Sequence, residues 1–238
     1  MRYLGGKAKI ARHVVDVIER YRAPGQPVRE PFCGGLNVTA ELARRGVFVF
    51  ASNASVPLIA LLTEVRDGWQ PPTALSEAEY AAARTLPPTH PLHGFAAFVG
   101  FGGAYFAGYP KDHGDHRQDY VGGTRTAITR DVSLVCASGT IGLLDMLAVE
   151  PGSTDALLYC DPPYRGTAGY GSIGAFDHAR FVERVVAWSR FTTVLVSEYD
   201  FPIGEVVWER ERASKLRVGG ARHVERIYLL APEGACQR

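Results

Sequence analysis

Apolar residues recur at helical spacing near the start of the chain and then give way to short apolar runs. Between residues 7 and 21 the apolar positions fall three or four apart with charged residues between them, which predicts an amphipathic helix. Two short strands are predicted at 27–32 and 47–52. Helices are predicted at 38–45, with Asn37 as N-cap and Gly46 as terminator, and at 56–65. This alternation indicates a parallel α/β sheet.

The alternation stops after residue 66. A helix is predicted at 76–85, opened by a capping box from Ser76 to Glu79. Residues 94–124 are rich in glycine and aromatic residues, fit neither a clean helix nor a clean strand, and are too aromatic for a disordered linker. We therefore interpret 67–130 as an inserted subdomain.

Strands and helices then resume. Strands are predicted at 132–137, 155–160 and 192–199, and helices at 140–148 and 176–191. The tail predicts two further strands joined by a hairpin around Gly219-Gly220. Segments 1–66 and 131–238 are thus expected to form one domain, with a mixed sheet that ends in the hairpin.

Composition narrows the class of protein. The chain has 238 residues, 46% of them hydrophobic, which is enough for one sizeable core. A formal net charge of +1 excludes a strongly basic surface, so any contact with nucleic acid must come from a local patch. The four cysteines form no CxxC pair, and no apolar run approaches a membrane span. We expect a cytoplasmic protein with reduced thiols.

The stretch "YCDPPYRG" (159–166) carries the strongest chemical signal. It places Asp161, Pro162, Pro163 and Tyr164 directly after an apolar strand, at the edge of a parallel sheet where ligands bind. A structural interpretation exists, in which the prolines end the strand and the tyrosine packs. The glycines of "EPFCGG" (30–35), after the first strand, would let a ligand approach the backbone at the same edge, although a tight turn also explains them.

The tetrad suits methylation of an exocyclic amine. The lone pair of such an amine is delocalised into the base, so acceptors on its hydrogens are needed to aim it. Asp161 and the Pro162 carbonyl can accept those hydrogens, and a proline-stiffened turn holds them at low entropic cost. The negative field stabilises the charge that grows on nitrogen. Tyr164 can stack on a base that has left its helix.

Six segments in the same order resemble the Dam-like DNA adenine-N6 methyltransferases, particularly their compact phage members. They are "RYLGGK" (2–7), "EPFCGG" (30–35), "ASNASVPLIALL" (51–62), "DPPY" (161–164), "VSEY" (196–199) and "KLRVGGARHVERIYLL" (215–230).

This resemblance implies a Rossmann-like S-adenosylmethionine-dependent methyltransferase fold in 1–66 and 131–238, with a target-recognition insertion at 67–130. It implies site-specific transfer of a methyl group to a flipped-out adenine of double-stranded DNA. We expect a monomer on its target site, with no metal and no membrane contact, in a bacterial or phage-infected cell. The implied catalytic residues are Asp161, Pro162, Pro163 and Tyr164. The implied cofactor contacts are Tyr3, Lys7, Phe32, Cys33, Gly34, Gly35, Asn53 and Asp161.

Three positions depart from the family pattern. Leu36 stands where the family turn has its last glycine, and Asn53 stands where an aspartate normally accepts hydrogen bonds from both ribose hydroxyls. Ser138 aligns with a second polar cofactor contact, expected after the strand that precedes the tetrad. Losing one charged hydrogen bond costs on the order of 1.5–3 kcal/mol, so the departures predict weaker cofactor binding or an adapted pocket.

Candidate DNA contacts lie in two basic regions. The insertion contributes Lys111, Arg117 and Arg125, among aspartates that also fit a solvated mixed-charge loop. Residues 210–226 contribute Lys215, Arg217 and Arg222 within a more basic stretch. His113 and His116 are interpreted as surface residues. Two rival functions remain open, namely an amine methyltransferase for RNA or protein and a catalytically silent DNA-binding relic.

Overall fold

The computed structural model describes residues 6–99, 119–149, 155–165, 176–213 and 222–232. Its described strands form a seven-stranded sheet in the order β3-β2-β1-β4-β5-β7-β6. Neighbouring strands from β3 to β5 are parallel, and β7 lies antiparallel between β5 and β6. The strands are β1 (Val28–Glu30), β2 (Val49–Asn53), β3 (Gly139–Leu143), β4 (Leu157–Cys160), β5 (Val194–Glu198), β6 (Glu205–Ala213) and β7 (Arg222–Leu230).

The sheet confirms the predicted fold class. In this sheet the antiparallel strand β7 lies between β5 and β6, next to a parallel α/β core. This is the arrangement of the Rossmann-like S-adenosylmethionine-dependent methyltransferase fold. The predicted C-terminal hairpin is also confirmed as β6 and β7, which pair antiparallel from Glu205↔Leu229 to Ala213↔Arg222. Its turn lies outside the described residues.

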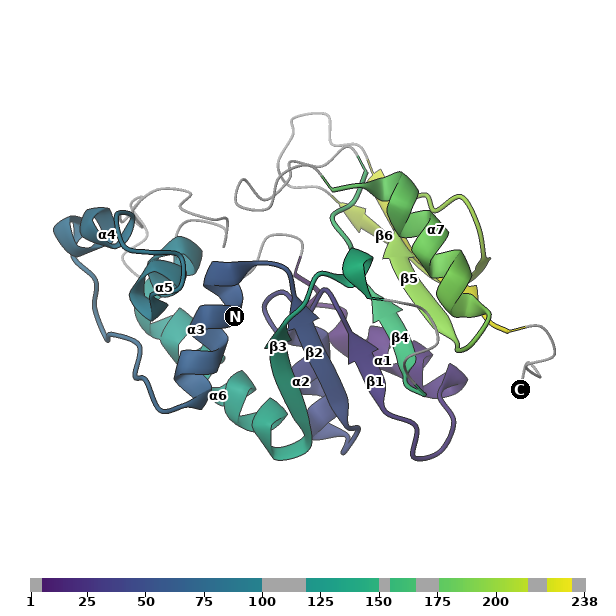
Figure 1. Cartoon of the computed structure of the whole chain (residues 1–238), viewed down its shortest axis with the longest axis horizontal. Coiled ribbons are helices and arrows are strands. Elements are labelled where there is room, and N and C mark those ends of the chain that lie inside the picture. Colours follow the sequence, from purple (N-terminus) through teal and green to yellow (C-terminus); the bar gives the residue numbers. More distant parts are fainter. Residues whose placement is uncertain (1–5, 100–118, 150–154, 166–175, 214–221, 233–238) are drawn as a thin grey trace.

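Helices cover the two sheet faces unequally (Figure 1). Helices α1 (Ala11–Tyr21), α2 (Asn37–Arg44) and α3 (Val56–Arg66) contribute to a large core with one face of the sheet, while α7 (His178–Ser189) lies against the opposite face. The amphipathic prediction for α1 is confirmed, because Val14, Val15 and Ile18 are fully buried and the charged positions point outward.

Two apolar clusters correspond to these faces. Alternate residues of β4 divide between them, since Leu157 and Tyr159 belong to the larger cluster and Leu158 and Cys160 to the cluster under α7. The cluster under α7 is completed by the 3-10 helix η2 (Met146–Ala148), which follows β3. Strand β4 is therefore buried on both faces, which explains its continuous apolar run.

The segment after α3 forms three described helices, α4 (Glu77–Ala83), α5 (Pro91–Val99) and α6 (Tyr120–Ser138). The capping box at Ser76 and Glu79 is confirmed. Helix α5 packs closely on α3, because a Cβ at Gly94 would lie 2.3 Å from the carbonyl oxygen of Pro57. Helix α6 runs across the predicted domain boundary at residues 130 and 131 and packs on α2 and α3.

Three local predictions are wrong. Residues 132–137 are the end of α6 rather than a strand, because Ile128, Val132 and Val135 continue one buried helical face. Residues 140–148 hold β3 and η2 rather than a helix, since Gly139 begins a strand that pairs in parallel with β2. The N-cap of α2 is Leu36 rather than Asn37, and it makes no side-chain capping hydrogen bond.

Candidate active site

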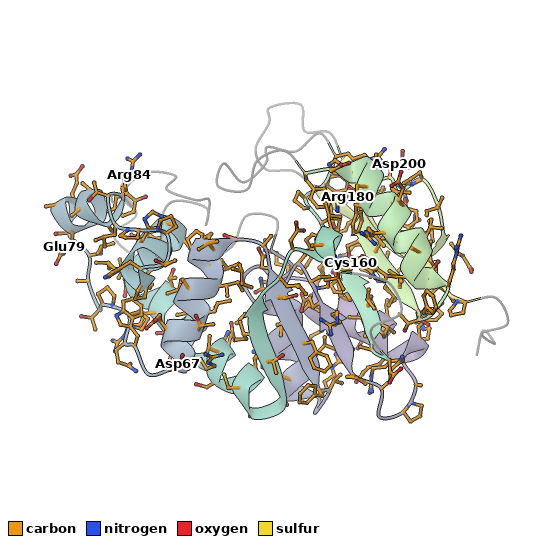
Figure 2. The ribbon with its side chains drawn as sticks, viewed as in Figure 1. Asp67, Glu79, Arg84, Cys160, Arg180 and Asp200 are labelled. Atoms are coloured by element: carbon orange, nitrogen blue, oxygen red, sulfur yellow. The ribbon has the colours of Figure 1, made fainter. Side chains whose placement is uncertain are left out.

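The candidate site lies where the connections of the sheet diverge. From β1 the chain continues to β2 on one side, whereas from β4 it continues to β5 on the other, and β1 and β4 are neighbours. Ligands of open α/β sheets bind beyond the carboxyl ends of strands at such a point. Residues 31–35 follow β1 there, and Asp161 follows Cys160, the last residue of β4, which is labelled in Figure 2.

The glycine turn after β1 is fixed to the end of β2. The amide of Cys33 donates to the Ser52 carbonyl at 3.0 Å, and the amide of Leu36 donates back to the Cys33 carbonyl at 2.9 Å. Gly34 adopts a φ of 44°, which suits glycine. Phe32 contacts Phe181 of α7 edge to face, with ring centroids 5.7 Å apart. The turn therefore presents buried backbone at the switch point.

Leu36 adopts the left-handed conformation, with a φ of 59° and a ψ of 23°. A non-glycine residue in this region costs about 1–2 kcal/mol, which explains why the family pattern has glycine here. The side chain of Leu36 is 1% exposed, and complete burial of a leucine contributes about 1.5–3 kcal/mol. Packing of the Leu36 side chain in the core thus offsets the backbone strain.

Lys7 connects the start of the described chain to the tetrad and to the C-terminal hairpin. Its Nζ lies 2.6 Å from Asp161 Oδ1 and 3.0 Å from Oε1 of Glu225 on β7. The three side chains are 4%, 17% and 0% exposed respectively, so the lysine is desolvated between two carboxylates. Lys7 therefore contacts the loop Asp161–Tyr164. Its predicted contact with the cofactor stays a prediction.

Tyr164 is bound into the same network. Its hydroxyl accepts a hydrogen bond from Lys7 Nζ at 2.7 Å and donates to Glu225 Oε1 at 3.2 Å. Its ring meets Tyr199 edge to face, with centroids 4.6 Å apart. Tyr199 follows β5, so two neighbouring loops supply an aromatic pair. The role of Tyr164 in stacking on a base stays a prediction.

Burial dominates the electrostatics of the site. It raises the pKa of Asp161 more than the attraction of Lys7 lowers it. It also raises the pKa of Glu30, at the end of β1, to about 8, and the pKa of Glu198, at the end of β5, to about 7. Burial alone would lower the pKa of Lys7, but attraction by Asp161 and Glu225 outweighs it and the pKa is raised. The lysine therefore stays charged at neutral pH.

Asn53 ends β2 beside the glycine turn and is 7% exposed. Its Oδ1 accepts a hydrogen bond from the amide of Ser55 at 2.9 Å. The acceptor that the sequence analysis assigned to a ribose is thus bound to the backbone. An aspartate at this position would keep that bond with one oxygen and offer the other to a ligand.

The alignment of Ser138 with the second polar contact is wrong. Ser138 ends α6 and precedes β3, whereas the carboxyl end of β3 is Leu143, paired with Asn53. Two residues beyond this end lies Asp145, whose Oδ1 accepts a hydrogen bond from the amide of Leu147 at 2.9 Å. The error follows from the strand wrongly predicted at 132–137.

The remaining predicted residues divide by placement. Arg125 lies part-buried on α6, and Arg222 begins β7 opposite Ala213. Tyr3, Lys111, Arg117, Lys215, Arg217, His113 and His116 lie outside the described residues. In the described part of the chain, no group of three or more histidine, cysteine or acidic side chains could hold a metal ion. No helix there is both long and apolar enough to cross a bilayer.

Sequence reasoning did not single out Glu30, Glu198 or Glu225. Glu30 and Glu198 each end a parallel strand, so the rule that ligands bind beyond the carboxyl ends could have identified them. Glu225 gave no such signal, since it lies inside an antiparallel strand and reaches the site through the register of the hairpin.

No known family model matches the sequence, and no curated protein matches it. The fold is similar to that of the rRNA methyltransferase AviRa from Streptomyces viridochromogenes, with 16% identity over 96% of this chain and 87% of that chain and a TM-score of 0.43. A putative methyltransferase, SMU.472, complexed with S-adenosylhomocysteine, has 10% identity over 98% and 54% of the two chains, with a TM-score of 0.45. The glycopeptide N-methyltransferase MtfA, complexed with S-adenosylmethionine, has 13% identity over 92% and 71%, with a TM-score of 0.36. At these identities and scores the likeness does not extend to substrates or site residues.

Proposed function

We propose that this protein transfers a methyl group from S-adenosylmethionine to the exocyclic amine of adenine in double-stranded DNA. One observation carries the proposal. The loop Asp161–Tyr164 follows the central strand β4 at the switch point of the sheet, beside the glycine turn that follows β1. An acceptor carboxylate, a rigid turn and an aromatic ring therefore meet where this fold binds its ligands.

The chain's own residues fit the proposed cofactor. The buried backbone at Gly34 and Gly35 allows close approach, and Asn53 and Asp145 supply polar groups at the ends of the next two strands. The carboxyl groups of Asp161 and Glu198 at the adjacent strand ends favour a positively charged ligand over a neutral one. S-adenosylmethionine, when bound, supplies an electrophilic methyl group on a sulfonium.

Asp161 then acts on the incoming amine. Its carboxylate accepts an amine hydrogen, which directs the nitrogen lone pair and stabilises the positive charge that grows during attack. The nitrogen–carbon bond forms as the carbon–sulfur bond breaks, the electron pair stays on sulfur, and the methylated nitrogen releases a proton to water. Pro162 is buried and Pro163 part-buried. Their burial and their fixed backbone φ angles restrain the loop that presents Asp161.

Lys7 and Glu225 determine the net charge of the group that surrounds Asp161. A lysine paired with Asp161 alone would neutralise the field that the amine needs. Glu225 takes a second contact with the same Nζ, so one cation is shared by two carboxylates and the group stays negative when both are ionised. Asp161 therefore keeps its ability to accept a hydrogen bond while its orientation is fixed.

The rival functions differ in which acceptor is labelled and in whether cofactor binds. We expect transfer from methyl-labelled S-adenosylmethionine to duplex DNA, and not to RNA or protein of the same cell. Asp161→Ala should abolish labelling while the circular dichroism spectrum is retained. Asp67→Ala is the matched control, because Asp67 is an exposed aspartate at the end of α3, and Figure 2 shows it well apart from Cys160, which precedes the tetrad.

Calorimetry provides the second arm. Wild type should bind one S-adenosylmethionine per chain, and Asp145→Asn should weaken that binding by roughly tenfold through loss of a charged acceptor. Labelling confined to RNA or protein would replace DNA as the substrate. Absence of binding at millimolar cofactor would identify a silent relic.

A further inference from the structure

One face of β1, β2 and β3 is not covered by any helix of the described residues (Figure 1). The cluster under α7 contains side chains of β4, β5 and β7, and none from β1, β2 or β3 among the described residues. The chain passes from β3 towards β4 through η2. The described part of this connection contains no helix longer than η2. Figure 1 shows the strands β3, β2 and β1 without a described helix in front of them. The opposite face of the same strands is buried under α1, α2 and α3.

Two phenylalanines project from this face. Phe48 immediately precedes β2 and Phe50 lies within it, so their side chains share one face at the spacing of two residues. Their ring centroids are 5.1 Å apart at an angle of 66°. Phe48 is 46% exposed, and neither ring belongs to a core cluster of the described residues. The neighbouring strand places Thr140, also exposed, opposite Phe50.

Arg29 stands beside the rings on the adjacent strand, β1. Its guanidinium carbon lies 5.1 Å from the centroid of Phe50, which is a cation–π distance. No carboxylate of the described residues pairs with it, and its Nε is buried without a hydrogen-bond partner. Burial alone lowers the pKa of Arg29, with no neighbouring anion to raise it. This cation is partly desolvated and has no counter-charge among the residues that the structure describes.

We propose that Arg29, Phe48, Phe50 and Thr140 form a platform that binds a single-stranded segment of nucleic acid. A base stacks on the exposed ring of Phe48, and a backbone phosphate meets the guanidinium of Arg29. Exposed aromatic rings on a sheet, interleaved with a cation, provide the two interactions that single strands need, a stacking surface and a phosphate contact. An apolar partner would satisfy the rings and leave Arg29 without an anion.

The platform is separate from the proposed methyl-transfer site. Phe48 lies at the amino end of β2 and Asn53 at its carboxyl end, a separation of about 16 Å for five residues of extended chain. The inference therefore goes beyond the proposed function, and binding here does not require Asp161. A single-stranded flank beside a target duplex, or a looped RNA, are the two sources of such a segment.

The test measures fluorescence anisotropy of labelled oligothymidylate and oligouridylate of about twelve nucleotides. Wild type and Asp161→Ala should bind at least one of the two probes with equal affinity. Phe48→Ala should weaken that binding by about fivefold or more. Arg29→Gln should lower the slope of log affinity against log salt by about 0.7.

Two variants serve as matched controls. Phe191→Ala removes a ring that is 62% exposed at the end of α7, and Arg190→Gln removes an exposed cation beside it. Both should bind the probe as wild type does. Affinity unchanged in Phe48→Ala, or equally reduced in Phe191→Ala, overturns the proposal. Failure of wild type to bind either probe also overturns it. If sedimentation then shows that wild type is a dimer and that Phe48→Ala is a monomer, the face belongs to a contact with a second copy of the chain.

Discussion

Glu30→Gln should stabilise the protein relative to wild type more at neutral pH than in mild acid. The compared quantity is the difference in unfolding free energy between the variant and wild type. Glu30 ends β1 at the head of the glycine turn, is 2% exposed, and accepts a hydrogen bond from Thr39 Oγ1 at 2.5 Å. Burial raises its pKa from 4.5 to about 8, because the folded state disfavours the charged form. Glutamine has nearly the same shape, keeps an acceptor for Thr39 and never ionises.

The size of the effect follows from the pKa. The folded-state pKa is above the unfolded value, so the contribution of protonated Glu30 to stability is complete below about pH 4.5 and is lost as the pH rises towards about 8. The shift of 8 − 4.5, or 3.5, corresponds to a total of about 5 kcal/mol. Between about pH 5.5 and about pH 7.5 wild type should lose about 2.5 kcal/mol of unfolding free energy that Glu30→Gln does not lose.

Urea unfolding followed by tryptophan fluorescence measures this difference. The gain of Glu30→Gln over wild type is determined at both pH values and subtracted, which cancels any fixed cost of the substitution. Glu64→Gln is the control for loss of a negative charge, because Glu64 is an exposed carboxylate on α3. A difference below about 0.5 kcal/mol, or an equal difference in Glu64→Gln, would refute the reasoning that burial keeps Glu30 protonated.

Three further predictions concern the site. Glu225→Gln should move the acidic limb of the pH–rate profile to lower pH, because Glu225 is one of the charges that raise the pKa of Asp161; an unmoved limb would contradict the coupling. Leu36→Gly should lower the unfolding free energy by about 1–3 kcal/mol in urea titrations, since relief of about 1–2 kcal/mol of strain does not offset lost burial and the cavity; a stabilised variant would show that strain dominates. Asn53→Asp should tighten S-adenosylmethionine by about tenfold in calorimetry, because aspartate keeps the bond to Ser55 and adds an acceptor; unchanged or weaker binding would indicate an adapted pocket.

The sequence predicted most of the sheet because its strands have local signals. Strand β4 is a continuous apolar run between turn residues, and the Gly219-Gly220 pair marked the hairpin that β6 and β7 confirm. The prediction for the segment 132–143 was wrong because its apolar residues fit both the helical spacing of about 3.6 residues and the strand spacing of two. Taken alone, Val132 and Val135 suggest a strand. In the structure they continue the buried face of α6 that includes Ile128.

The candidate site was predictable where it depends on strand ends. Asp161, Gly34 and Asn53 all lie at the carboxyl edge that the α/β pattern indicates. Glu225 was not predictable, because its place depends on hairpin register and on the long-range contact with Lys7, which the sequence separates by more than two hundred residues. The local sequence pattern identifies the loops of a site. The charged residues that shift the pKa values within it are brought there by tertiary contacts, which the pattern does not show.

Nucleoside mass spectrometry of duplex DNA incubated with the protein and S-adenosylmethionine tests the central claim most directly. Digestion to nucleosides distinguishes N6-methyldeoxyadenosine from other methylated nucleosides, so it reports both the reaction and the atom methylated. The account predicts that N6-methyldeoxyadenosine accumulates with wild type and is absent with Asp161→Ala, whose fold is retained. Methylation at any other atom, or the same yield from both proteins, would contradict the assignment of Asp161 as the acceptor that orients an adenine amine.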